Sequence, residues 1–383
     1  MIKKLAWLLM SLFLLASCGG GTDLASNGVG SGGTGSYTSG PVSGLGSIIV
    51  NGVRYDVENA TVTDDDGTVE FGKSSLQLGM YVEVQGNAIS VASNSDDADD
   101  STATVVRVAS DFIGPAQSIQ RNVDGDITSF TVFGRLIQTD SKTIYSAALA
   151  DGDRVAVYGL VSDGAYKATR VQRLSNSTAV FKLTGKVASW APGSRQFSFG
   201  GRTFEYANDS DLPAGFGVGS WVRVRVVAAS VFLSPIPAYT VKAVNAALTS
   251  APVARLKGLI GVLNSQSDFV VNGVRVNASS LALSGLQELD RVEIRGQIVN
   301  GVLVATDVEV EDDGEVELKK IELHGRASSI SGNTFVVKGL TVYFVPTEGA
   351  VSPDECVQVR GERFNGSFQL VATEVRRNQS DCR

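Results

Sequence analysis

The stretch FVVNGVRV, residues 269–276, decides the fold because close versions of it recur along the chain about every sixty residues. It belongs to a repeated order of four segments: an opening segment with a glycine, a segment of the type FxVxG, a segment of the type GDxVxVxG, and a closing segment that ends in AxxV. In this copy the four segments read LKGLIGVL (256–263), FVVNGVRV, LDRVEIRG (289–296) and LVATDVEV (303–310).

This copy and four others account for nearly all of the chain beyond residue 42. The counterparts of FVVNGVRV lie in GLGSIIVNGVRYDV (44–57), FTVFGRLI (130–137), FSFGGRTFEY (197–206) and FVVKGLTVYF (335–344). Apolar and polar residues alternate with a period of two, as in VEVQG, VAVYG, VRVRV, VEIRG and VQVRG, which indicates half-buried antiparallel strands. The sequence therefore predicts an all-β protein.

The repeats predict a tandem array of about five small antiparallel β-barrels behind an N-terminal leader. We place a lipoprotein signal peptide at residues 1–17 and a flexible, Gly/Ser-rich tether at residues 18–41. The predicted barrels cover residues 42–108, 109–178, 179–250, 251–315 and 316–383. A single unit of this size is marginally stable alone, so neighbouring units are expected to support one another.

The order of these segments resembles small five-stranded, OB-like barrels of exported bacterial proteins. Over residues 42–377 the chain is similar to proteins with tandem DUF5666 domains, most clearly in residues 44–57 and in the GDxVxVxG segments. The third copy departs from the pattern with Ser220 in place of the Asp, and the fifth has Glu355 and Cys356 there. The resemblance implies an architecture and no activity, because the family has none assigned.

The N-terminus has the layout of a bacterial export signal that ends in a lipid attachment site. Lys3 and Lys4 precede an apolar run that breaks at Cys18, which is too short to cross a bilayer. Residues 15–18, LASC, resemble a lipobox, which implies that Cys18 carries the lipid. The predicted location is the cell envelope, and Gly19 after the cysteine resembles lipoproteins of the outer membrane.

The remaining cysteines, Cys356 and Cys382, form an even pair in a compartment that permits disulfides. A disulfide between them would close a loop of roughly 26 residues, which would stabilise the folded state by about 3 kcal/mol. Two free or buried thiols remain the alternative.

Nucleotide and nucleic-acid binding are disfavoured. GTVEFGKS (67–74) matches GxxxxGK[ST], but strands surround it where a phosphate-binding loop needs a following helix. The GxGxxG matches, at Gly28, Gly30 and Gly33 and at Gly30, Gly32 and Gly35, fall in the tether. The formal net charge of −7 is also unlike a protein that contacts phosphates.

The sequence offers little for catalysis, and we predict no catalytic residue and no cofactor. His324 is the only histidine and aligns with Thr184 and Lys257, which we expect at the surface of an opening strand. No GxSxG elbow occurs.

Three acidic runs could in principle hold calcium, but none has the spacing of a calcium loop, so we interpret them as solvated loops and predict no metal site. They are Asp64, Asp65 and Asp66; Asp96, Asp97, Asp99 and Asp100; and Glu311, Asp312 and Asp313.

Aromatic residues fall into two groups. Phe130, Phe197, Phe269 and Phe335 recur at one position of the repeat and are expected in the barrel cores. Trp190, Trp221, Tyr158 and Tyr239 are the rings expected to be available for stacking on a ligand.

These features favour a non-enzymatic envelope lipoprotein that presents barrel modules for binding or spacing, with the membrane as a partner through its lipid. The alternative is a carbohydrate-binding or glycan-active envelope protein that uses paired carboxylates on a barrel face. Oligonucleotide binding through an OB-like face is a third, weaker hypothesis.

Overall fold

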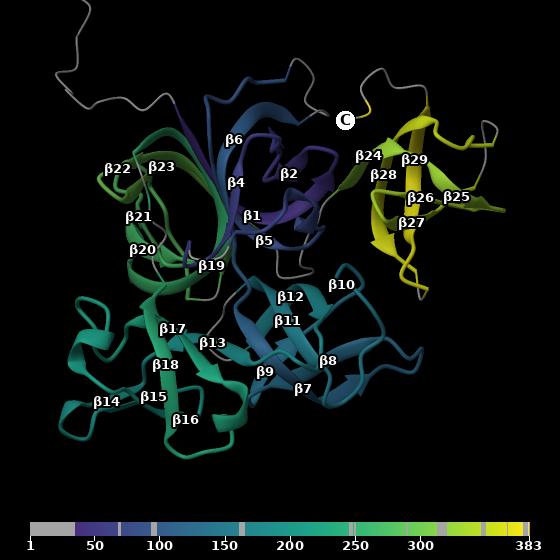
Figure 1. Ribbon diagram of the computed structural model, residues 1–383. Coiled ribbons are helices and arrows are strands. Elements are labelled where there is room, and N and C mark those ends of the chain that lie inside the picture. The colour runs from purple at the N-terminus through teal and green to yellow at the C-terminus, as the bar shows by residue number, and fades with distance from the viewer. Residues whose placement is uncertain are drawn as a thin grey trace, which may run out of the picture. The chain divides into compact units, whose positions relative to one another are not determined.

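The computed structural model describes residues 35–67, 70–92, 98–160, 165–244, 248, 250–288, 290–311, 320–345, 350–365, 367–377 and 382 (Figure 1). These residues form strands, and their helical segments are single 3₁₀ turns at Lys73–Ser75, Pro192–Ser194, Asp209–Asp211 and Ala228–Ser230. Among them, no helix has the length and apolar character needed to cross a membrane. The predicted all-β fold of repeated small barrels is confirmed.

Barrel 4 shows the unit most simply. It consists of β19 (Ala251–Ser265), β20 (Asp268–Val271), β21 (Val274–Asn277), β22 (Arg291–Val299) and β23 (Val302–Glu311). Each strand pairs antiparallel with its neighbour in the order 1-2-3-5-4-1, except that β21 and β23 run parallel. This closed order is the OB topology, and Figure 1 shows the green strands curling around one another.

The other four barrels repeat this order. Barrel 1 contains β1 (Ser36–Leu45), β2 (Ile48–Val50), β3 (Val53–Asp56), β5 (Tyr81–Gly86) and β6 (Asp99–Val108), with β4 (Thr61–Asp64) beside β6. Barrel 2 contains β7 (Phe112–Arg121), β8 (Ile127–Val132), β9 (Arg135–Gln138), β11 (Arg154–Leu160) and β12 (Ala165–Arg173), with β10 (Ile144–Tyr145) beside β12.

In barrels 3 and 5 the opening strand is divided in two. Barrel 3 contains β13 (Val180–Lys186), β14 (Ser189–Ala191), β15 (Gln196–Phe199), β16 (Arg202–Glu205), β17 (Trp221–Val227) and β18 (Ile236–Ala243). Barrel 5 contains β24 (Ile321–Arg326), β25 (Ser328–Ser331), β26 (Thr334–Val337), β27 (Leu340–Tyr343), β28 (Cys356–Phe364) and β29 (Leu370–Arg377).

A two-residue hairpin turn between the second and third strands explains the quoted stretch. Asn272 and Gly273 both have positive φ, 49° and 80°, as a type I′ turn requires. The Asn272 side chain lies where a Cβ on Gly258 of the opening strand would be, 2.3 Å from its Nδ2. The opening glycine therefore makes room for the turn residue. Corresponding turns occur at Asn51–Gly52, Phe133–Gly134, Gly200–Gly201 and Lys338–Gly339.

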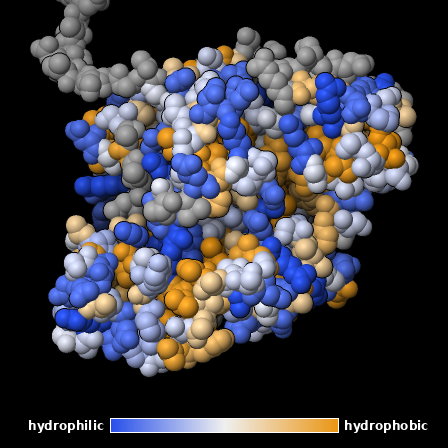
Figure 2. Space-filling view, viewed as in Figure 1, coloured by the Kyte–Doolittle hydropathy of each residue, from blue (hydrophilic) through white to orange (hydrophobic). Residues whose placement is uncertain are grey.

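Apolar residues on the inward faces of the strands fill each barrel, while polar residues occupy the outward faces. The predicted core rings Phe130, Phe197, Phe269 and Phe335 are all buried, which confirms that prediction. Figure 2 shows polar side chains over much of the viewed face, with apolar residues interspersed. The alternation in the sequence thus marks the inside and outside of every barrel.

Strand pairing also joins different barrels. Residues Ser36–Ser39 of β1 pair in parallel with Val253–Leu256 of β19, and Gly44 and Leu45 pair with β24 of barrel 5. Lys182 of β13 pairs with Ile113 of β7, which links barrels 2 and 3. Barrels 1, 4 and 5 therefore share one hydrogen-bonded sheet, and barrels 2 and 3 share another.

This pairing corrects the predicted end of the tether. Residues 36–41, predicted as part of the Gly/Ser-rich tether, belong to β1 because their backbone groups pair with β5, and those of residues 36–39 also pair with β19. Their Ser, Thr and Gly content resembles a linker, but small side chains suit a strand enclosed between two others.

Truncation of a core ring tests the assignment of the repeated phenylalanine. Phe269→Ala is expected to destabilise the protein by about 3–5 kcal/mol, because it leaves a cavity in the centre of barrel 4. Urea unfolding followed by circular dichroism measures the loss. Tyr239→Ala, at a side chain that is 66% exposed, is the matched control. Equal unfolding midpoints for the two variants would contradict the assignment.

Candidate functional site

The acidic run Asp64–Asp66 lies at the end of β4 and packs against barrel 3. Gly67, with φ of 69°, closes the turn and donates its amide to the carbonyl of Asp64 at 3.0 Å. The three carboxylates are largely buried, with side-chain exposures of 9%, 4% and 10%. The interpretation of this run as a solvated loop was therefore wrong.

Three cations of barrel 3 neutralise the three carboxylates. Asp65 Oδ2 lies 2.7 Å from Lys182 Nζ and 2.8 Å from Arg223 Nε. Asp66 Oδ1 lies 2.6 Å from Arg223 Nη1. Arg225 Nη2 completes the network at 3.0 Å from Asp64 Oδ2 and 2.8 Å from Asp66 Oδ2.

This charge balance decides between a metal site and a junction. The carboxylate oxygens of Asp64, Asp65 and Asp66 lie within 4.8 Å of one another, which is close enough to share an ion. However, a divalent cation would have to displace protein cations that are themselves buried, and a buried charge left without its partner is costly. The cluster therefore fits an electrostatic junction between barrels 1 and 3 better than a calcium site.

Burial and the carboxylates act against each other on the cations. Burial lowers the pKa of the Lys182 ammonium, and nearby Asp65 opposes that shift without cancelling it. For Arg223, burial also favours the neutral form, but Asp65 and Asp66 outweigh it and raise the pKa of the guanidinium. Both cations thus depend on Asp65.

The network predicts an asymmetry between its partners. Asp65→Ala is expected to cost about 3–5 kcal/mol of stability, because it leaves Lys182 and Arg223 buried without their shared carboxylate. Lys182→Met is expected to cost less, because Asp65 keeps both arginines and the aliphatic stem is replaced by a similar volume. Urea unfolding of the two variants measures the difference, and equal losses would contradict a shared role for Asp65.

A small cavity of about 50 Å³ lies beside this network, where barrels 1 to 4 meet. Its lining includes Tyr81, Glu83, Asp111, Arg223 and Asn272. The Tyr81 hydroxyl donates to the Lys257 carbonyl (2.8 Å) and accepts from Asn272 Nδ2 (2.5 Å). A buried water molecule needs about 10–15 Å³ of such space, so the cavity has room for a few waters and is far below the size of ligand pockets.

Two carboxyl groups of this cavity have perturbed pKa values. Burial raises the pKa of Glu83, although Arg107 and Arg223 oppose the shift. Burial also raises the pKa of Asp111 from 3.8 to about 6, partly offset by a 2.5 Å hydrogen bond that its Oδ2 accepts from the Tyr166 hydroxyl. Such shifts can mark a catalytic acid, but here the cavity is too small for a substrate.

The Asp111 pKa predicts a pH-dependent stability. Because the pKa in the folded state lies above the unfolded value, the contribution of Asp111 is fully present below pH 4 and is lost as the pH rises through about 6. Asp111→Asn keeps an oxygen that accepts from Tyr166 and never ionises. Relative to the wild type, the variant is expected to gain on the order of 2 kcal/mol between these pH values. Parallel stability curves from pH 4 to 7 would contradict this assignment.

Two aligned residues expected at the surface are buried instead. Thr184 and Lys257 are only 1% and 7% exposed, because the opening strands of barrels 3 and 4 face other barrels. The third, His324, is partly buried, and its Nε2 lies 3.8 Å from Cys356 Sγ. That sulfur is bonded to Cys382, so the pair is no thiol-imidazole nucleophile.

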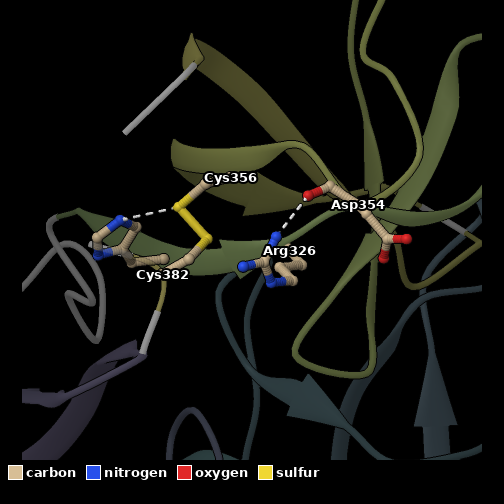
Figure 3. Close-up of a disulfide and its surroundings, with 5 residues drawn as sticks. Arg326, Asp354, Cys356 and Cys382 are labelled. Carbon is tan, nitrogen blue, oxygen red and sulfur yellow. Dashed lines mark hydrogen bonds between the residues drawn. A yellow bond between two sulfur atoms is a disulfide. The ribbon is translucent and has the colours of Figure 1, made fainter. Parts of the chain in front are cut away.

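The predicted disulfide is present. Cys356, at the start of β28, is bonded to Cys382 and ties residue 382 to barrel 5 (Figure 3). Beside it, Arg326 Nη1 donates to the Asp354 carbonyl at 3.0 Å.

The remaining candidates are distributed without forming one site. Lys73 is exposed on a single 3₁₀ turn that leads into coil and then β5, so no helix follows the GxxxxGK[ST] match. Asp99 pairs with Arg255 of barrel 4, which again differs from a solvated loop.

Among the four rings expected to be available, Trp190 and Tyr239 are exposed and Trp221 is partly buried. The prediction was wrong for Tyr158, which is 7% exposed and packs with the core of barrel 1.

Several candidate residues lie outside the described part of the chain. They are Cys18, Gly28, Gly30, Gly32, Gly33, Asp96, Asp97, Asp312 and Asp313, together with the predicted signal peptide and most of the tether.

The fold and its junctions define a protein of tandem OB-topology barrels that are joined by shared strands and buried ion pairs. The chain belongs to the DUF5666 family, whose model, described as "Domain of unknown function (DUF5666)", matches residues 39–90, 115–172, 257–309 and 324–376. These ranges make up more than half of the chain and fall in barrels 1, 2, 4 and 5.

Comparison with individual proteins adds little. No curated protein matches the chain. A solved structure titled "drosophila Unr CSD456" is similar to 47% of this chain and 87% of its own, at 16% identity and a TM-score of 0.16. At these values the likeness supports no conclusion about a ligand.

Proposed function

We propose that this protein is a non-enzymatic lipoprotein of the bacterial cell envelope, which presents its barrels as modules for binding or spacing. An export signal over residues 1–17, a lipobox that ends at Cys18 and a Gly/Ser-rich segment before β1 support anchoring through lipid. The outer membrane is the expected site, and the lipid bilayer is the expected partner. The negative net charge argues against nucleic acid.

The observation that carries this proposal is that charged side chains form ion pairs and hydrogen bonds between barrels. Barrel 1 contacts barrel 3 through Asp64–Asp66, barrel 4 through Asp99 and Arg255, and barrel 5 through Arg54 and Glu322 at 2.6 Å. Arg170 of barrel 2 donates to the Leu78 carbonyl of barrel 1 at 3.1 Å. Groups that could serve chemistry instead hold modules in register, which suits a presenting or spacing role.

The cysteine pair fits the same compartment. A disulfide such as Cys356–Cys382 persists in oxidising surroundings outside the cytosol and is rare within it. It therefore supports the export that the N-terminal sequence predicts.

The alternative, a glycan-active protein, needs two carboxyl groups on either side of a sugar. Glu83 and Asp111 are carboxyl groups that share a cavity, but about 50 Å³ is too little for a sugar ring. This pair therefore supports a buried junction more than a hydrolytic site. This argument does not apply to carbohydrate binding without catalysis, because binding alone needs no pair of carboxyl groups.

Replacement of the lipid-bearing cysteine tests the anchoring. After cell lysis, the wild type is expected in the membrane fraction. Most of the Cys18→Ala variant is expected in the soluble fraction, because the acyl chains supply the membrane attachment. Immunoblots of membrane and soluble fractions measure the distribution, and incorporation of labelled fatty acid checks the modification. A Cys356→Ser, Cys382→Ser double variant that keeps Cys18 is the matched control and should stay membrane-bound. Retention of Cys18→Ala in the membrane, or a wild type without lipid, would overturn the proposal.

A further inference from the structure

A larger cavity, of about 630 Å³, lies between barrels 2 and 5. The β7–β8 hairpin and the β9–β10 loop of barrel 2 form one side, and the β28–β29 hairpin of barrel 5 forms the other. Its volume falls within the range of roughly 300–1,000 Å³ that is typical of small-molecule sites. This cavity, unlike the one beside Asp111, has room for a ligand.

Asparagine side chains hydrogen-bond to the described backbone of both hairpins. Asn122 Oδ1 accepts the amides of Asp124 (3.0 Å) and Asp126 (2.9 Å). In barrel 5, Asn365 Oδ1 accepts the amides of Ser367 and Gln369, both at 3.0 Å. Such hydrogen bonds lower the conformational freedom that a binding loop would lose when a ligand binds. The two walls are therefore preorganised.

Aromatic rings form part of the lining. Phe368 is 45% exposed, and its ring centre lies 6.1 Å from that of Tyr145 on β10. The backbone of Phe368 has a φ of 58°, a conformation that a bulky side chain rarely adopts. Strained residues of this kind cluster at binding sites, where the surrounding structure holds them in place. The hairpin turn requires a positive φ here, since Gly125 takes the same place with φ of 89° in the matching turn of barrel 2. Phe368 thus places an exposed aromatic ring where glycine is the usual residue.

One polar group of the lining lacks a partner. The Tyr145 hydroxyl oxygen is buried and makes no hydrogen bond with any described residue. Thr139, which lines the same cavity, donates to the Ile127 carbonyl at 2.6 Å, and its oxygen can accept from the Tyr145 hydroxyl only at a geometry outside the usual limits of a hydrogen bond. Buried hydroxyl groups nearly always find a partner, so a bound molecule or water is expected at Tyr145.

The charges of the lining favour a neutral ligand. Arg121 is committed to the carbonyls of Gly125 (2.8 Å) and Leu149 (3.0 Å). The second cation, Arg363, shares the lining with the three carboxylates of Asp124, Asp126 and Asp140. Anions such as phosphate would meet these carboxylates, and cations would meet the arginines. A molecule with many hydroxyl groups can donate to the carboxylates and place an apolar face on an aromatic ring.

From this geometry we infer that the cavity between barrels 2 and 5 binds a neutral oligosaccharide. Phe368 provides the stacking surface, and Tyr145 donates a hydrogen bond to a sugar oxygen. The carboxylates of Asp124 and Asp126 accept hydrogen bonds from sugar hydroxyls. This inference rests on the proposed role as a binding module and gives that role a ligand class. It involves recognition without bond cleavage.

Calorimetric titration of the full chain, held in a detergent without a sugar headgroup, tests the inference. The probes are maltohexaose, cellohexaose and chitohexaose at millimolar concentrations. At least one is expected to bind the wild type. Phe368→Asn removes the ring but tolerates the positive φ, and it is expected to weaken that binding at least about tenfold. Tyr145→Phe is expected to weaken it severalfold, because only the hydroxyl is lost.

Tyr239→Ala is the matched control, because it removes an exposed ring from barrel 3, away from the cavity, and it should bind as the wild type does. Thermal unfolding midpoints near that of the wild type confirm that each variant folds. Absence of binding for all three sugars would overturn the inference. So would binding that Phe368→Asn leaves unchanged, or tighter binding of a thymidine oligonucleotide. Cys18→Ala should bind sugar normally, so failure of anchoring and failure of sugar binding are distinguishable.

Discussion

The backbone of β1 is the element on which the rest of the structure depends. Its first half hydrogen-bonds to β5 of its own barrel on one edge and to β19 of barrel 4 on the other, and its last residues pair with β24 of barrel 5. A unit of about sixty residues buries only about 60% of the surface that its unfolded chain exposes. Shared strands give these small units a common sheet, so that barrels 1, 4 and 5 support one another.

Buried charges determine which faces of the barrels meet. Such pairs contribute little net stability compared with apolar contacts, but removal of one partner is costly. Asp65 with Lys182, and Glu322 with Arg54 and Arg360, therefore penalise any arrangement in which these partners are separated. The same logic applies to Tyr81, whose hydroxyl joins Ser39 of its own barrel to Lys257 and Asn272 of barrel 4. Buried polar contacts and shared strands thus occur at the same junctions between barrels.

The sequence predicted what is local to one repeat and failed at contacts between repeats. Period-two alternation and the recurring phenylalanines predicted the barrels and their cores, because the apolar residues within each strand mark the side that faces the core. The turns at Asn51–Gly52 and Asn272–Gly273 could also have been predicted, since Asn-Gly is the strongest signal for a two-residue hairpin.

By contrast, Asp64–Asp66, Thr184 and Tyr158 look the same in sequence whether they face water or another barrel. Their partners lie tens to more than a hundred residues away in the sequence, and a local sequence pattern cannot predict contacts over such separations. The aromatic ring of Phe368 and the hydroxyl of Tyr145 were missed for the same reason, because only the fold brings barrels 2 and 5 together.

The pairing of β1 with β19 also has a consequence for the order of assembly. About two hundred residues separate the two strands, so the partner of residues 36–39 leaves the ribosome long after they do. During that interval the outer edge of β1 is open to wrong partners, which is the usual hazard of an unpaired strand. A chain that stops before its fourth copy would keep the edge exposed permanently.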